Sequence, residues 1–261
     1  MLFLSTQPLW LSGLILLVPT TLVAMAGPVI VRRFIALDHL RTNNEVAGFK
    51  FATIGVIYAV LLAFAIIVVW ERFNHAESDV ATEAGAAAIV FRLAQGLEAA
   101  HDAAIGKATT AYLKAAIDKD WPAMEKGELS RETTQALNRI YDAVLKFHAV
   151  DTSEGVVIAE ILRNLDQLSE ARRERLVAAT GIVPDIIWIV LIGGALLTIG
   201  FTFFFGTANL RAQSAMSGAL SLLIFGGLMT IIVIDHPFAG PVKVRPEPIA
   251  AVLADFGDAA R

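Results

Sequence analysis

The chain has 261 residues, of which 56% are hydrophobic and 18% charged, with a formal net charge of −4 and no cysteine. This composition is too apolar for a soluble domain and indicates a membrane protein. The absence of cysteine excludes disulfides, thiolate nucleophiles and sulfur-rich metal sites, and the acidic balance argues against nucleic acid as a partner because phosphate binding requires a basic face.

Two uncharged runs near the start of the chain predict the first two membrane helices. Residues 1–31 carry no charge and are followed by Arg32 and Arg33. A signal peptide would place its basic residues before the apolar run, so this run is read as a membrane helix. The second run, Phe51–Trp70, has the roughly 20 residues that a helix needs to cross about 30 Å of hydrocarbon.

Between residues 71 and 183, charges are spread throughout and apolar residues recur at helical spacing. The pattern predicts an extramembrane bundle of four antiparallel helices. Their expected spans are 77–97, as a direct continuation of the second membrane helix, 103–117, 130–150 with Ser130 as N-cap, and 153–181.

Two later uncharged runs, 186–209 and 212–234, predict a second membrane hairpin with a tight turn. The tail after Asp235 contains four prolines, which predicts extended backbone. The expected fold class is therefore an all-α membrane protein with two transmembrane hairpins flanking a helical bundle. Its expected parts are 1–70 (first hairpin), 71–183 (bundle), 184–235 (second hairpin) and 236–261 (tail).

Four crossings place both chain ends and the helical domain on one side of the membrane. The first loop carries Arg32, Arg33, Arg41 and Lys50, which favours a cytoplasmic loop and an extracytoplasmic domain. Basic residues on the domain side, from Arg72 to Arg245, make the balance nearly even.

Acidic side chains mark the domain-side ends of three predicted membrane helices. Glu71, Asp185 and Asp235 would form an acidic, cation-selecting ring at the mouth of a symmetric assembly, and His236 is a further candidate at the same end. The competing interpretation is that Glu71 is solvated, that Asp185 complements the positive end of its helix, and that Asp235 caps the helix before it.

At the opposite side, Asn44, Glu45 and Arg211 occupy the two short loops. A Glu45–Arg211 pair competes with a simple helix start, in which Asn44 is the N-cap and Glu45 lies in the first turn. Within the second span, Tyr58 is expected either to bridge helices by a hydrogen bond or to line a pore.

Small residues recur every four positions in three of the predicted spans, which indicates helix packing more than a pore. The stripes are Gly55, Ala59 and Ala63 on the second span, Gly194, Thr198, Thr202 and Gly206 on the third, and Ser214 and Gly218 on the fourth, where Gly227 lies further along.

Signatures of zinc proteases, serine hydrolases, P-loop proteins and Rossmann folds are missing, so an enzyme is not expected. The five histidines show no ligand spacing. We therefore expect no catalytic residues, no metal and no cofactor.

Several phrases resemble a bacterial bestrophin-like family of unknown function. They are N-E-V-A-G-F from Asn44, R-R-E-R-L from Arg172, D-H-P-F-A-G from Asp235 and P-E-P from Pro246. The resemblance covers nearly the whole chain. True bestrophins are pentameric anion channels with a cytosolic helical domain, so the resemblance implies a channel architecture and the opposite membrane orientation.

The sequence thus favours a homo-oligomeric ion channel of four or five subunits in the lipid bilayer. The second helix would line the axis, and small inorganic ions would pass, with cations favoured over anions by the acidic mouth. The alternative is a membrane-anchored sensor or scaffold whose helical domain binds a ligand or a protein partner.

Overall fold

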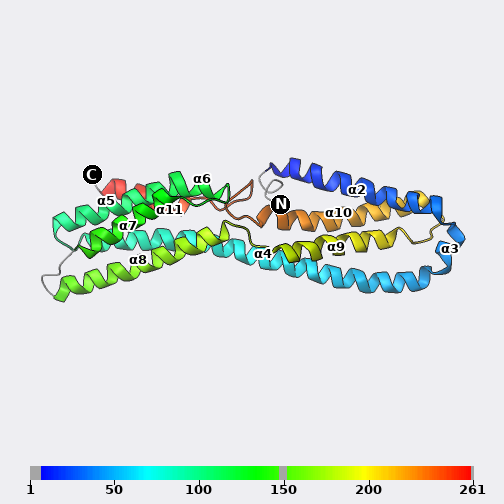
Figure 1. The fold of residues 1–261 in the computed structure, drawn as a ribbon, viewed down its shortest axis with the longest axis horizontal. Coiled ribbons are helices and arrows are strands. Elements are labelled where there is room, and N and C mark those ends of the chain that lie inside the picture. The colour runs from blue at the N-terminus through cyan, green and yellow to red at the C-terminus, as the bar shows by residue number, and fades with distance from the viewer. Residues whose placement is uncertain (1–6, 147–151, 260–261) are drawn as a thin grey trace. The chain divides into compact units, whose positions relative to one another are not determined.

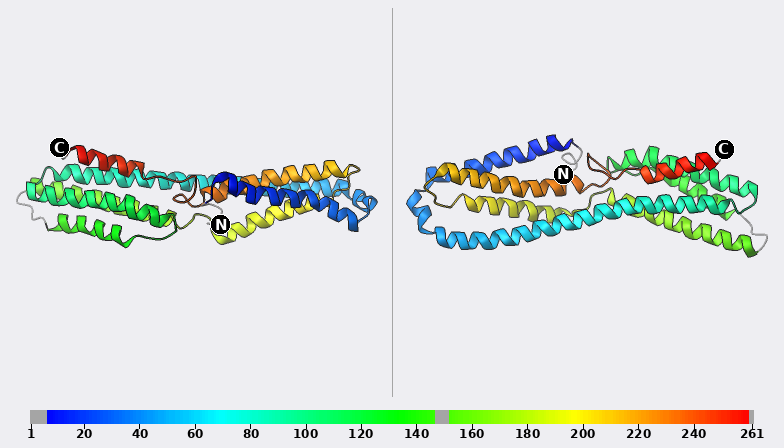
Figure 2. Two further views of the ribbon diagram at one scale, coloured as in Figure 1. Left: turned by 90° about the horizontal axis from the view of Figure 1, so that it is seen from above. Right: turned by 180° about the vertical axis from the view of Figure 1, so that it is seen from behind.

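The computed structural model describes residues 7–146 and 152–259, which form helices and loops without a strand among them. By their contacts the helices divide into two units. The membrane unit contains Met1–Glu71 and Ile182–Asp235, and the helical domain contains Arg72–Gly181 and His236–Arg261. Figure 1 shows the elements of each unit, and Figure 2 gives two further views.

The membrane unit contains the helices that are long and apolar enough to cross a bilayer, and four such helices occur in the described part of the chain. They are α2 (Leu9–Phe34), the first part of α4 (Asn44–Ala94), α9 (Asp185–Thr202) and α10 (Leu210–Ile234). The short helix α3 (Leu37–Thr42) links the first two. The prediction of four membrane helices is therefore confirmed.

Small residues let the membrane helices approach closely, since lipid tails give helices no hydrophobic reason to associate. A Cβ atom on Gly218 would lie 2.7 Å from Met25 of α2, and one on Gly194 would lie 2.5 Å from the ring of Tyr58 of α4. The stripes on α9 and α10 thus contact neighbouring helices of the same chain. The stripe on α4 differs, because Gly55 has no such neighbour and Ala59 and Ala63 are exposed.

The helical domain packs the second part of α4 with α5 (Ala99–Ala115), α7 (Arg131–Leu145) and α8 (Thr152–Ala178). Fully buried apolar side chains from these helices form its core, including Val80, Ile105, Ile140 and Leu165. The predicted N-cap is confirmed, because the Ser130 hydroxyl accepts a hydrogen bond from the Thr133 amide at 3.4 Å. The end of the predicted 130–150 helix lies partly outside the described residues.

Two helix boundaries differ from the sequence-based expectation. The helix expected over 103–117 continues beyond α5 as a π-helical turn, η1 (Ala116–Asp120), and a short helix, α6 (Trp121–Met124). Pro122 is compatible with this because it lies near a helix start, where its missing N–H is tolerated. Helix α9 ends at Thr202 rather than Asn209, so the loop is longer than the predicted tight turn.

The tail is the clearest correction. It was predicted to be extended throughout, yet it forms helix α11 (Glu247–Ala259). Proline is compatible with the first turn of a helix, where the backbone N–H has no intrahelical partner. Pro248 occupies that turn, while Ile249 and Phe256 are buried in the domain core.

Candidate functional site

The domain-side end of the membrane unit is organised by Asp235, the C-cap of α10. The Asp235 carboxylate is 2% exposed, and its Oδ1 accepts hydrogen bonds from the amides of Ile182 at 3.1 Å and Val183 at 2.8 Å. The Ile182 amide also contacts the Asp235 carbonyl at 3.1 Å. Asp235 therefore fixes the loop that leads into α9. Its carboxylate is buried against backbone amides and is not exposed at a channel mouth.

The remaining residues predicted for this end lie in different environments. Asp185 is exposed in the first turn of α9, where its charge complements the positive helix end. Glu71 is exposed on α4. In the helical domain, the imidazole of His236 packs against Gly181, where an added Cβ would lie 3.1 Å from Nε2.

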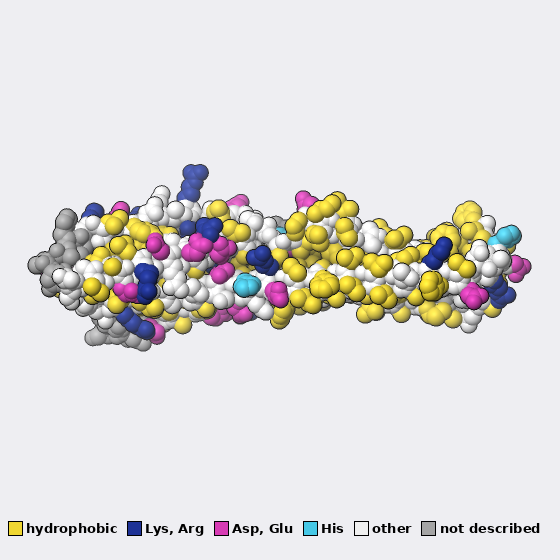
Figure 3. All heavy atoms as spheres, turned by 90° about the horizontal axis from the view of Figure 1, so that it is seen from below, with side chains coloured by type: hydrophobic (Ala, Val, Ile, Leu, Met, Phe, Trp, Pro, Cys, Tyr) yellow, Lys and Arg dark blue, Asp and Glu magenta, His cyan; other side chains and the backbone are white. Residues whose placement is uncertain are grey.

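One face of α4 is exposed along the helix, and we call it the open face. Figure 3 shows that hydrophobic side chains dominate the visible surface of the membrane unit, whereas charged side chains are spread over the helical domain. Within the 18-residue apolar window of α4, 11% of the residues are buried, against 56% for α10. The open face comprises Phe49, Val56, Ala63 and Ile67 in the membrane unit and Asn74, Ser78, Ala81 and Gly85 in the helical domain, all exposed.

These open-face residues follow one another at spacings of three, four or seven, which places them on the same side of a helix. Glu71 follows Ile67 by four residues and precedes Ser78 by seven, so its carboxylate belongs to this face. The four residues that form the helical-domain part of the open face are small or uncharged, and the exposed Glu77 borders them, three residues after Asn74 and four before Ala81. Small, uncharged residues suit a packing or pore-lining surface.

Tyr58 lies on the other side of α4 and is 4% exposed. Its hydroxyl donates to the Leu191 carbonyl of α9 at 3.0 Å, and its ring occupies the space that a Cβ on Gly194 would need, at 2.5 Å. The interhelical hydrogen bond, one of the two alternatives for this residue, is therefore the one observed.

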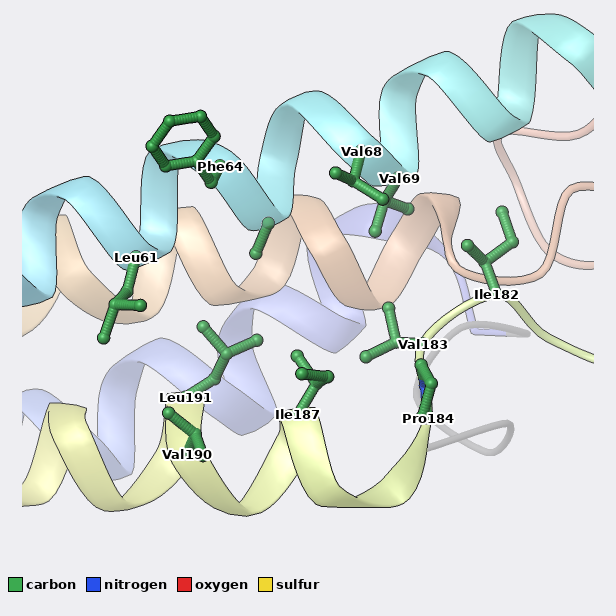
Figure 4. A pocket seen from close by; sticks show the side chains of 11 residues that line it. Leu61, Phe64, Val68, Val69, Ile182, Val183, Pro184, Ile187, Val190 and Leu191 are labelled. Atoms are coloured by element: carbon green, nitrogen blue, oxygen red, sulfur yellow. The ribbon is translucent and has the colours of Figure 1, made fainter.

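Two apolar grooves flank the membrane part of α4. The groove between α4 and α9 has a volume of about 270 Å³ and is shown in Figure 4, where Leu61 and Val69 of α4 point toward Ile187 and Leu191 of α9. The loop Ile182–Pro184 closes one of its ends. The second groove, between α4 and α10, has a volume of about 810 Å³ and includes Gly55 and Ala59.

At the opposite end of the membrane unit, Asn44 makes a reciprocal pair with the backbone of Gly206. Its Nδ2 donates to the Gly206 carbonyl at 2.7 Å, and its Oδ1 accepts from the Gly206 amide at 2.8 Å. Asn44 is therefore the first residue of α4 but not its side-chain N-cap, because its amide group is engaged by the α9–α10 loop. Glu45 does lie in the first turn. No ion pair joins it to the exposed Arg211 in the described part of the chain.

Sequence reasoning missed a buried polar contact at the same end. Gln213 of α10 is 3% exposed. Its Oε1 accepts from Arg32 Nη2 at 3.4 Å and from the Thr207 hydroxyl at 3.2 Å, and its Nε2 donates to the Phe205 carbonyl at 2.5 Å. A polar residue in a uniformly apolar span was the available signal.

The helical domain contains a fully buried ionic cluster that sequence reasoning also missed. Arg175 Nε donates to Glu83 Oε2 at 2.6 Å, and Arg175 Nη2 donates to Asp120 Oδ2 at 3.0 Å. Arg172 Nε binds Asp120 Oδ2 at 3.0 Å, and the Tyr112 hydroxyl donates to Glu83 Oε1 at 2.5 Å. Two arginines balance two carboxylates, so the cluster is neutral overall.

The opposite charges of the cluster offset the cost of burying each of them. Burial opposes the charge on Arg175, but the adjacent Glu83 carboxylate raises the pKa of the guanidinium above its usual value. Burial, reinforced by Glu83, raises the pKa of Tyr112 well above its ordinary value and keeps its hydroxyl a donor. The indole of Trp121 lies under Arg175, with 4.6 Å from the guanidinium carbon to the ring centroid. The cluster thus joins α4, α5, η1 and α8.

Four membrane helices, with a helical domain inserted between the second and third, define the class: an all-α, multi-pass membrane protein. The profile of the Bestrophin-like domain matches residues 18–249. The chain therefore belongs to the bestrophin-like family. No curated protein matches the sequence.

Solved structures share the fold. Two are variants of a bacterial bestrophin homologue from Klebsiella pneumoniae. The first has a TM-score of 0.71 and 16% identity and covers 93% of this chain and 99% of the homologue. The second has a TM-score of 0.71 and 14% identity, with 94% and 98% covered. A further structure of a homologue from that organism has a TM-score of 0.68 and 17% identity, with 92% and 96% covered.

Proposed function

We propose that this protein is a homo-oligomeric channel for small inorganic ions in the bacterial inner membrane, with the open face of α4 lining the axis. The observation that carries the proposal is the exposure of this face in both parts of α4. Lipid tails would cover the apolar residues of the open face inside the membrane. They would not cover the part of this face in the helical domain, which comprises Asn74, Ser78, Ala81 and Gly85. Other copies of α4 around a water-filled axis account for both parts.

Membership of the bestrophin-like family supports the channel, since bestrophins conduct ions. Cations are favoured because Glu71 is exposed on the open face at the end of the membrane span, where a ring of carboxylates would attract them. Asp235 does not contribute to this ring in the proposal, because its carboxylate is bound to backbone amides.

Planar-bilayer recording of the purified protein under a KCl gradient tests the proposal. We expect channel currents with a reversal potential on the cation-selective side, moved toward zero by Glu71→Gln. Glu128→Gln is the control, because Glu128 is an exposed carboxylate of the helical domain outside α4. A silent protein across salts and voltages would refute the channel, and an unchanged reversal potential in Glu71→Gln would refute the role of Glu71.

Membrane orientation is open to a direct experiment because the chain has no cysteine. Single cysteines at Asn43, in the first loop, and Glu128, in the helical domain, are both exposed positions. An impermeant thiol reagent applied to intact spheroplasts labels the second if the basic loop is cytoplasmic. It labels the first if the domain is cytosolic, as in true bestrophins.

A further inference from the structure

The helical domain has a surface groove where the end of α4, the middle of α5 and helix α11 meet. Its volume is about 450 Å³, within the range of about 300–1,000 Å³ typical of small-molecule sites. Its apolar floor includes Phe91, Leu253 and Phe256, with Phe91 and Phe256 stacked at a centroid distance of 3.8 Å and an interplanar angle of 12°.

A glycine lets the aromatic floor of the groove pack closely against α5. A Cβ on Gly106 would lie 3.3 Å from the ring of Phe91, so the ring reaches the helix backbone directly. One turn later, the Thr110 hydroxyl is engaged with the Gly106 carbonyl at 2.8 Å. Thr110 therefore lines the groove without offering a free donor, and charged donors must come from its neighbours.

Those donors are Lys107 and Lys114, which lie on the same side of α5 and are both exposed. Seven residues separate them, or about 10 Å along the axis, so both flexible side chains can reach an anion placed over Thr110. Neither has an ion-pair partner in the described residues, whereas Lys119 pairs with Glu132 at 3.2 Å. The groove lining contains one carboxylate, that of Asp102, against these two cations.

We propose that this groove binds a small, flat aromatic anion, with its ring on the phenylalanine floor and its phosphate or carboxylate between Lys107 and Lys114. Aromatic rings pack favourably on one another in offset or edge-to-face arrangements, and lysine binds phosphate and carboxylate as a point charge. The proposal goes beyond conduction, since the groove lies wholly within the helical domain and its occupancy is measured without any current.

Isothermal titration of the full-length protein in detergent at low salt tests it, with 1-naphthyl phosphate and 2-naphthoate as probes. Inorganic phosphate supplies the anion without the ring, and 2-naphthalenemethanol supplies the ring without the charge. We expect at least one probe to bind tenfold or more tightly than both analogues. The preferred probe distinguishes a phosphate ligand from a carboxylate ligand.

Variants locate the binding. Lys107→Gln and Lys114→Gln should each weaken binding several-fold, and Ala103→Trp should abolish it by filling the groove. Lys126→Gln is the matched control, because Lys126 is an exposed lysine outside the groove. A thermal unfolding curve for each variant shows that it is folded. Binding of neither probe above its analogues, or equal losses in the groove variants and the control, would overturn the proposal.

Discussion

Buried charges in the helical domain are tolerable because each has its partner in place. Glu83, Asp120 and Arg175 have fully buried side chains, and Arg172 is 6% exposed. Such a cluster is weak evidence for added stability, since desolvation offsets much of the attraction. Removing one member is different, because it leaves an uncompensated charge in the core.

Replacing Glu83 with Gln should therefore destabilise the protein strongly. The variant keeps the size of the side chain but leaves Arg175 with less negative charge, at a cost of about 3–5 kcal/mol. The melting temperature in detergent should fall on the order of 10 °C. Glu170→Gln is the control, because Glu170 pairs with Arg173 on the exposed surface, where solvent screens the attraction. Equal shifts for the two variants would contradict a structural role for the cluster.

Asp79 predicts a pH dependence of stability. Burial raises its pKa, and the carboxylates of Glu174 and Glu83 add to this while His75 opposes it. A raised folded-state pKa means that the folded protein binds this proton more tightly than the unfolded chain. Stability from this group is therefore lost as pH rises from the unfolded pKa through the folded one.

Asp79→Asn should remove that loss. We expect a higher melting temperature than wild type at pH 8 and a difference that shrinks toward pH 4, measured in matched buffers. Asp118→Asn, at an exposed position on η1, should show no such pH-dependent gain. A difference that grows toward low pH would reverse the assigned sign.

At the scale of single residues, sequence reasoning succeeded where the cause is local. Ser130 caps α7 because its hydroxyl reaches an amide three residues later, a relation visible in the sequence. It failed where partners are distant in the chain. Arg172 and Arg175 look like surface charges on a helix, and only the folded domain shows that they face Asp120 and Glu83.

Among the elements, the α3–α4 corner depends on close backbone contact with the loop after α9. A Cβ on Gly206 would lie 2.6 Å from the Arg41 backbone nitrogen and 2.8 Å from the Leu40 carbonyl carbon. Backbone atoms cannot yield as a flexible side chain can. The Asn44–Gly206 pair requires this same approach.

Gly206→Ala should therefore displace the loop and weaken the Asn44 pair, lowering stability by about 1–3 kcal/mol as overpacking typically does. The melting temperature measures the loss. Gly200→Ala, at a helical position where a Cβ meets nothing within 4 Å, should leave it unchanged or slightly higher. If both substitutions were neutral, the corner would not depend on the glycine.

Helical periodicity predicted the elements well where the chain is long and regular. The continuation of the second membrane helix into the domain was read from charge and spacing, and α4 runs unbroken from Asn44 to Ala94. The prediction of an extended tail was wrong because it rested on the four prolines and not on the helical spacing of the apolar residues. Two of them lie at the start of α11, where proline is compatible with a helix, and the stack of Phe256 on Phe91 is a tertiary contact.

At the scale of the whole molecule, the single chain leaves its longest helix least covered. Helices α2 and α10 contact each other closely at small residues, while the open face of α4 has no partner in the described chain. The grooves on either side of α4 are apolar as well. In a monomer, the open face of α4 would contact lipid and water. In a ring of subunits, the α4 helices of the other subunits would cover it.

Native mass spectrometry of the detergent-solubilised protein decides between these states. The channel requires a closed ring of four or more subunits, because four-helix protomers of this size enclose a central path only together. Ala81→Glu, on the helical-domain part of the open face, should destabilise the ring by bringing like charges together around the axis. Glu128→Gln, at an exposed position outside α4, should leave the subunit number unchanged. A monomer or dimer would instead favour the alternative of a membrane-anchored sensor, in which the groove of the helical domain is the functional site.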